Sequence, residues 1–154
     1  MNIRSIAQND FNQVHTLVCQ VHGLHVSNRP DFYNDVDPFD KEYIEHLLND
    51  EKTIALVAED CGKIVGYCVF TIREPSKNPL LKERIVAYME DLCVDENQRK
   101  LGIGQSLFEE AQRASKNRGA NVLELMVWAF NTSAIHFYEK MGMTPRSYTM
   151  EKRL

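Results

Sequence analysis

The stretch Arg99-Lys100-Leu101-Gly102-Ile103-Gly104 lies between an apolar run that predicts a strand, residues 85–94, and a run that predicts a helix, residues 105–118. The two alternating glycines let consecutive backbone N–H groups converge without interference from Cβ atoms. The positive end of the following helix points at the same place, so an anionic phosphate is the expected ligand. Arg99 and Lys100 add charge at the rim. The loop is therefore interpreted as a pyrophosphate cradle, and the alternative is a plain turn between a strand and a helix.

What the loop lacks excludes two classes of phosphate-binding protein. A nucleoside triphosphate P-loop ends in Gly-Lys-Ser/Thr, whereas Gly104 is followed by Gln105 and Ser106. A dinucleotide-binding fingerprint needs a third glycine three residues after the second, and Leu107 holds that position. Neither class of phosphate-binding protein therefore fits this loop.

Length, charge and composition set the outer limits. A chain of 154 residues, 44% of them hydrophobic, is long and apolar enough for one domain, residues 1–154, with a single core. No apolar run approaches the roughly 20 residues that span a bilayer, and the first residues lack a signal-peptide core. We therefore expect a cytoplasmic protein with no membrane partner. A net charge of −4 without a basic tract argues against nucleic-acid binding.

Neither the cysteines nor the histidines predict a metal site or a disulfide framework. The four cysteines, at positions 19, 61, 68 and 93, form no Cys-x-x-Cys pattern and are interpreted as reduced thiols. His22 and His25 lie three residues apart without a third ligand nearby, so we expect no metal. Carboxylates gather between residues 31 and 45, where they form either a rim that attracts cations or a solvated face.

The order of predicted elements indicates an α/β fold. Apolar periodicity, caps and turn residues predict strands at 2–7, 53–59, 63–73, 85–94, 122–128 and within 143–152, and helices at 10–23, 37–48, 105–118 and 132–141. Strands and helices in this order build a sandwich on a single mixed sheet flanked by helices.

Two further segments make the pattern specific. The first is Tyr88-Met89-Glu90-Asp91-Leu92-Cys93-Val94-Asp95, and the second runs from Trp128-Ala129-Phe130-Asn131 through Tyr138 to Gly142. Together with Arg99-x-x-Gly102-x-Gly104 they closely resemble the Gcn5-related N-acetyltransferase (GNAT) superfamily, and the strand is similar to that of diamine and polyamine N-acetyltransferases. The resemblance implies a three-layer sandwich with a mostly antiparallel sheet.

The resemblance also implies acetyl-CoA as the acetyl donor. Backbone amides of the cradle would hold its pyrophosphate, the strand ahead of the loop would pair with its pantetheine arm, and Asn131 would hydrogen-bond that arm. The implied cofactor-binding residues are Leu92, Cys93, Val94, Arg99, Lys100, Leu101, Gly102, Ile103, Gly104, Gln105 and Asn131. Lys100 stands where the family often has glycine, a departure that is tolerable if Lys100 keeps an ordinary negative φ.

Acetyl transfer to an amine needs a base, because only about one alkylamine in 10³ is neutral at pH 7. Glu90 is the first candidate, and Asp91 is the second, as base or as a charge that recruits the amine. Strand alternation places Glu90 on the face of Tyr88 and Leu92 and turns Asp91 the other way. The alternative for Glu90 is a plain ion pair on a strand.

Tyr138 holds the family's general-acid position, where a phenol would donate to the departing thiolate. Its alternative is a packing role within the helix. Tyr33 falls in the segment 22–40, where the family builds its acceptor wall, and Trp128 ends a strand beside the expected acyl site. We therefore count Tyr33, Glu90, Asp91 and Trp128 as candidate substrate-binding residues.

The sequence thus favours an N-acetyltransferase that works by direct transfer in a ternary complex. A small cationic amine, such as a polyamine or an aminoglycoside, is the favoured acceptor. The alternatives are a protein N-terminus or lysine as acceptor, and a non-catalytic CoA-binding sensory module. Strands within residues 143–152 could pair between subunits, so a homodimer is a further expectation.

Overall fold

The computed structural model describes the backbone of residues 1–154 and the side chains of residues 1–40 and 42–154. The strands are β1 (Asn2–Ser5), β2 (Thr53–Asp60), β3 (Lys63–Arg73), β4 (Val86–Val94) and β5 (Val122–Leu125). The helices are α1 (Phe11–Asn28), α2 (Lys41–Asn49), α3 (Ile103–Asn117) and α4 (Thr132–Lys140), with short 3-10 turns η1 (Gln8–Asp10) and η2 (Glu96–Gln98).

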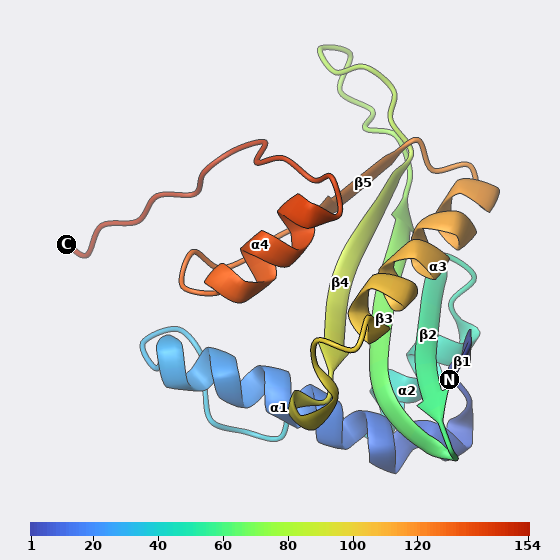
Figure 1. The fold of residues 1–154 in the computed structure, drawn as a ribbon. Coiled ribbons are helices and arrows are strands. Elements are labelled where there is room, and N and C mark those ends of the chain that lie inside the picture. The colour runs from blue at the N-terminus through green and yellow to red at the C-terminus, as the bar shows by residue number, and fades with distance from the viewer.

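The strands form one sheet in the order β1-β2-β3-β4-β5, with helices on both faces (Figure 1). The first four strands pair antiparallel, and β4 pairs with β5 in parallel. The predicted mixed, mostly antiparallel sheet in a three-layer sandwich is confirmed.

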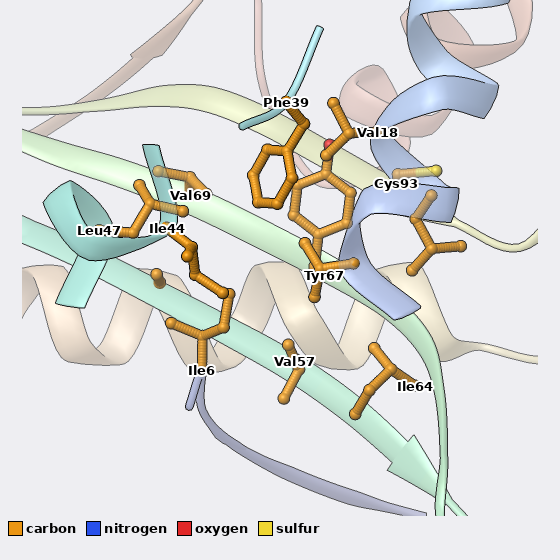
Figure 2. Close-up of a cluster of buried hydrophobic side chains, with 13 residues drawn as sticks. Ile6, Val18, Phe39, Ile44, Leu47, Val57, Ile64, Tyr67, Val69 and Cys93 are labelled. Atoms are coloured by element: carbon orange, nitrogen blue, oxygen red, sulfur yellow. The ribbon is translucent and has the colours of Figure 1, made fainter. Parts of the chain in front are cut away.

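Each face of the sheet has its own buried cluster, because alternate strand residues point to opposite sides. One cluster joins α1 and α2 to the sheet through Leu17, Ile44 and Val57, and Figure 2 shows its tyrosine, Tyr67, lying beside Phe39. The other joins α3 to the opposite face through Phe70, Leu107 and Phe108. The sheet is therefore held from both sides and gives a rigid frame for β4.

Two predicted helix boundaries are wrong. Helix α1 does not end at Gly23 but continues to Asn28, since one interior glycine costs only about 1 kcal/mol. Helix α2 begins at Lys41, four residues after the predicted start at Asp37. Its N-cap is Asp40, whose Oδ1 accepts the Tyr43 N–H at 2.8 Å.

The predicted strands within residues 143–152 are also wrong, and the strand expected at 122–128 ends at Leu125. Residues 143–154 form no strand, and ion pairs of Arg146 with Glu124 and of Glu151 with Arg29 attach the segment to the molecule. Pro145 lacks the N–H that a ladder requires, which favours this outcome. No helix in the described part of the chain is long and apolar enough to cross a membrane.

Candidate active site

Strand β4 has two halves with different partners. Residues 86–89 pair with β3 on one side and with β5 on the other, from Val86↔Val122 to Met89↔Leu125. Beyond Met89, β4 continues to Val94 beside β3 alone, because β5 has ended (Figure 1). Strand residues present N–H and C=O groups to both sides in turn, so residues 92–94 keep groups on their open edge that can pair with an added extended chain.

A β-bulge lies at the junction of the two halves. The register with β3 passes from Met89↔Phe70 to Asp91↔Val69, which leaves Glu90 as the extra residue. A bulge shifts the alternation of side chains by one position. Met89 and Leu92 consequently both pack on the α3 face, whereas Cys93 lies in the cluster under α1 and α2.

The bulge overturns the predicted separation of the two carboxylates. Asp91 accepts a hydrogen bond from the Tyr67 hydroxyl, which belongs to the cluster under α1 and α2. Glu90 is paired with Arg73 at 3.1 Å, and the Arg73 guanidinium lies 3.4 Å from the centre of the Tyr88 ring. The negative charges of both carboxylates also raise the pKa of the Tyr43 phenol in α2. Glu90 and Asp91 therefore gather at the α2 side of the sheet, and Leu92 is the residue that points away.

The two carboxylates differ in their surroundings. Glu90 is exposed, with 37% of its side chain accessible. Asp91 is half-buried, and burial raises its pKa to about 6, with Glu90 adding to the rise while the Tyr67 hydroxyl opposes it. Burial and the same two charges raise the pKa of Tyr43 to about 12, so its phenol keeps its proton at neutral pH. The α2 side of β4 therefore carries the exposed carboxylate of Glu90, the weakly acidic carboxyl of Asp91, and the phenols of Tyr43 and Tyr67.

Tyr138 reaches the same junction from the other face. Its hydroxyl lies 3.5 Å from the sulfur of Met89, the last β4 residue that pairs with β5. Burial and the charge of Asp91 raise the pKa of this phenol, which stays protonated. The junction thus has a proton donor on the α3 and α4 side and carboxylates on the α2 side.

The predicted cradle follows β4 directly. The first helical bond of α3 runs from the Ser106 N–H to the Gly102 carbonyl, at 3.0 Å. The N–H groups of the preceding residues, Ile103, Gly104 and Gln105, have no acceptor within the described part of the chain, as expected at a helix start. Free N–H groups at a helix amino end fit a diphosphate well.

Lys100 does not meet the condition of a negative φ. Its φ is +66°, and Gly102 follows at +82°. Both residues therefore adopt the left-handed conformation. A lysine in this region carries a strain of about 1 kcal/mol that glycine avoids, which agrees with glycine being frequent there.

The other residues that the resemblance implies for the cofactor differ in how much of their side chains is available. The side chains of Ile103 and Cys93 are buried in the two clusters, and Leu101 is exposed. Arg99 donates from Nε to the Val94 carbonyl at 3.3 Å, which ties the loop to the strand. Asn131 accepts the Ala134 N–H at 3.1 Å and so caps α4, with its side-chain NH₂ left as a donor.

Tyr33 and Trp128 come together as a pair. The Trp128 indole N–H donates to the Tyr33 hydroxyl at 2.8 Å, although 95 residues separate them. The guanidinium of Arg29 lies 4.7 Å from the Trp128 ring centre and occupies one ring face. Within the described residues no hydrogen bond or ion pair links this pair to the β4 carboxylates. The pair joins the loop after α1, which carries Tyr33, to the segment between β5 and α4, which carries Trp128.

Three residues around the carboxylates were not anticipated: Tyr43, Tyr67 and Arg73. Nothing in the local sequence marks them, because each reaches β4 from another element. Tyr43 also lines an acidic hollow of about 480 Å³ together with Asp37, Pro38, Phe39, Asp40, Glu42 and His46. The carboxylates predicted at 31–45 thus contribute in part to a concave surface.

Comparison with known proteins identifies the family. The model of the acetyltransferase (GNAT) family matches residues 20–143. An uncharacterised N-acetyltransferase of Methanocaldococcus jannaschii is 32% identical over 100 residues, which are 65% of this chain and 43% of the relative. An N-alpha-acetyltransferase of Sulfurisphaera tokodaii is 32% identical over 105 residues, which are 65% of this chain and 61% of the relative. The chain therefore matches only about half the length of these curated relatives.

Solved structures agree on the fold. A mutant protein from Bacillus halodurans has a TM-score of 0.96 and 33% identity, with 100% of this chain and 99% of that chain covered. An aminoglycoside N-acetyltransferase in complex with CoA has a TM-score of 0.75 at 18% identity, with 99% of this chain and 100% of that chain covered. The match over residues 20–143, in a sheet whose β4 opens ahead of the cradle, means that the chain belongs to the acetyltransferase (GNAT) family.

Proposed function

We propose that the protein transfers an acetyl group from acetyl-CoA to the amino group of a small cationic amine, by direct attack in a ternary complex. One observation carries the proposal: the bulge at Glu90 coincides with the end of β4–β5 pairing. A protonated phenol therefore stands on one side of an open strand edge, and two carboxylates gather on the other.

The chain's own groups fit the donor. Free N–H groups at the start of α3 would hold its diphosphate, and the open edge of residues 92–94 would pair with its amide-bearing arm. Asn131 would use its free NH₂ on the same arm. When bound, acetyl-CoA supplies an activated thioester, and the β4 edge fixes its direction toward the junction.

The base must receive a proton from an amine that is almost entirely protonated at pH 7. Glu90 is proposed for this step because its carboxylate is exposed and can reach an acceptor directly or through water. Asp91, with a pKa of about 6, would add negative charge that recruits the cation and is the alternative base. Tyr43 and Tyr67 would hold hydroxyls beside the two carboxylates.

Tyr138 is proposed to stabilise the departing thiolate. Its raised pKa makes full proton transfer to a thiolate unfavourable, so a hydrogen bond that strengthens as charge develops on sulfur is the expected contribution.

The acceptor is proposed to be a small cation. The hollow that shares Tyr43 carries the carboxylates of Asp37, Asp40 and Glu42, which favour a positively charged ligand. A protein N-terminus is the second candidate, because a relative at 32% identity bears the name of an N-alpha-acetyltransferase.

Two experiments test the proposal. The first incubates the chain with acetyl-CoA and a panel of polyamines, aminoglycosides and short peptides, and measures thiol release. Turnover with polyamines or aminoglycosides above that with peptides supports the favoured acceptor, and the reverse order supports the protein N-terminus. Tight CoA binding without turnover on any amine supports a sensory module instead.

The second experiment isolates the cradle by calorimetry with CoA. Gly102→Ala and Gly142→Ala are matched, since both glycines have a positive φ, +82° and +85°, and no atom within 4 Å of an added Cβ. Both variants should lose a similar stability of about 1–2 kcal/mol. Only Gly102→Ala should lose CoA affinity, and equal affinity in the two variants would contradict the cradle.

Two expectations from the sequence stay predictions: a cytoplasmic location, and a homodimer formed through residues 143–152. A native mass measurement tests the second.

A further inference from the structure

A second group of reactive side chains lies on helix α1 and on the loop that precedes α2. It consists of His15, Cys19 and Asp37, whose potential ligand atoms all lie within 4.8 Å of one another. His15 and Cys19 are four residues apart and so share one face of α1. Asp37 lies 18 positions after Cys19, in the loop before α2, which is why the sequence alone predicted no metal site.

We propose that His15, Cys19 and Asp37 form a binding site for a divalent transition-metal ion of the zinc class. The three side chains supply one nitrogen, one sulfur and one carboxylate, which is a donor set that such ions favour. The proposal uses no residue on β4, the cradle or α4, and its test does not depend on acetyl transfer. Asp37 also lines the acidic hollow proposed for the acceptor, so a bound ion would reduce the negative charge of that hollow.

The distances suit a shared ion. The Nε2 atom of His15 lies 2.9 Å and 3.1 Å from the two Asp37 oxygens, and 3.8 Å from the Cys19 sulfur. A tetrahedral zinc ion with ordinary bond lengths separates its nitrogen and sulfur ligands by about 3.5 Å. The Cys19 sulfur is almost equally far from His15 Nδ1, at 3.9 Å, so the imidazole would rotate to point one nitrogen at an ion shared with the sulfur and the carboxylate.

The surroundings support ligand roles. The Phe39 N–H donates to Asp37 Oδ1 at 3.1 Å and orients the carboxylate, as outer partners of metal ligands commonly do. The rings of Phe11 and Phe39 lie 5.8 Å and 6.1 Å from the His15 ring and limit its movement. Cys19 and Asp37 also line a hollow of about 400 Å³ with His22 and Asp35, which gives an ion a path of entry and leaves room for water as a fourth ligand.

Metal binding would fix the loop against the helix. In the structure, two hydrogen bonds already join the loop to α1. His15 bonds to Asp37, and His22 bonds to the Asn34 carbonyl at 2.9 Å. On binding, the ion would displace the proton of the Cys19 thiol, because a thiolate is the form that ligates metal. The same loop carries Tyr33, so the ion would hold one end of the proposed acceptor wall.

The test uses the full chain with Cys61→Ser as parent, because Cys61 is an exposed thiol that could bind metal by itself. Cobalt titration should give a sulfur-to-cobalt charge-transfer band. Added zinc should displace the cobalt and remove the band. Adding zinc at about 100 times its Kd should raise the thermal midpoint by about 5–10 °C, and a chelator should reverse the rise.

Variants identify the ligands. Cys19→Ser should abolish the charge-transfer band, and His15→Gln and Asp37→Asn should each weaken zinc binding more than about tenfold, because even loss of an outer partner costs about 10- to 100-fold. His136→Gln, an exposed histidine on α4, is the control and should bind zinc as the parent does. A band that persists in Cys19→Ser, or zinc affinity equal in the parent and all three ligand variants, overturns the proposal. Circular dichroism of each metal-free variant verifies that it is folded.

Discussion

The two halves of β4 show how one strand serves both the core and the site. Residues 86–89 pair with strands on both sides, and Ala87 and Met89 are buried. Residues 91–94 pair with β3 alone, the bulge residue Glu90 has no partner in the register, and the loop up to residue 102 continues this open part. Both halves belong to one apolar run, yet the first half stabilises the sheet and the second exposes carboxylates and backbone groups.

The difference between the two halves of β4 shows that the site depends on where β5 ends rather than on the composition of β4. Because β5 stops at Leu125 and a bulge follows Met89, the edge opens where Glu90 and Asp91 stand. If this view is right, substitutions in the open half should change rate, ligand binding or pH dependence, and substitutions in the paired half should chiefly change stability.

The largest effect is expected for Glu90→Gln. If Glu90 is the base, the rate at neutral pH falls by about 10²- to 10⁴-fold with little change in unfolding free energy. Steady-state kinetics with the best amine of the panel measures it. Glu74→Gln is the control, since Glu74 is an exposed carboxylate paired with Lys52 at 2.7 Å and should leave the rate unchanged. A rate near that of the parent would transfer the role to Asp91.

Met89→Ala should lower the free energy of unfolding by about 2–5 kcal/mol, because a buried side chain between Phe70 and α3 is lost. Urea unfolding followed by circular dichroism measures this change. Leu80→Ala is its control: Leu80 is 88% exposed and should change stability by less than about 0.5 kcal/mol. Equal unfolding free energies for Met89→Ala and Leu80→Ala would contradict the view that residues 86–89 chiefly stabilise the sheet.

Asp91→Asn should raise stability at pH 8 by up to about 3 kcal/mol. In the folded protein the pKa of Asp91 is about 6, against an ordinary value of 3.8, so the folded state favours the protonated form. Asp91 therefore costs no stability below about pH 4, and the cost grows as pH rises through 6 and then levels off. Asparagine does not ionise, so Asp91→Asn removes this loss of stability. Unfolding measured at pH 4 and pH 8 checks the sign, and an equal difference at both values would contradict it.

The smallest effect is expected for Lys100→Gly, which should raise stability by at most about 1 kcal/mol because Lys100 has a φ of +66°. The more flexible unfolded chain of glycine offsets part of the gain. CoA affinity, measured by calorimetry, should fall slightly through loss of one positive charge. A clear loss of stability would mean that the lysine side chain supports the loop.

Several features of the site were predictable from local sequence. The cradle needs only two glycines and a helix start, which are neighbours in the chain, and the order of strands and helices follows from apolar periodicity. The features that failed depend on distant partners. The alternation along β4 was wrong because the bulge arises from its register with β3, and the strands at 143–152 were wrong because no ladder forms there.

The sequence by itself determined the family, the α/β class and the place of the glycine loop before α3, since these depend on residue types at short spacing. The tertiary structure decided that Glu90 and Asp91 gather on one side, that the Tyr67 hydroxyl donates to Asp91, and that Asp37 meets His15 and Cys19. The physical reason is that strand register and helix packing are set by the whole sheet and its two buried clusters. A contact between residues far apart in the chain has no local signature until those clusters form.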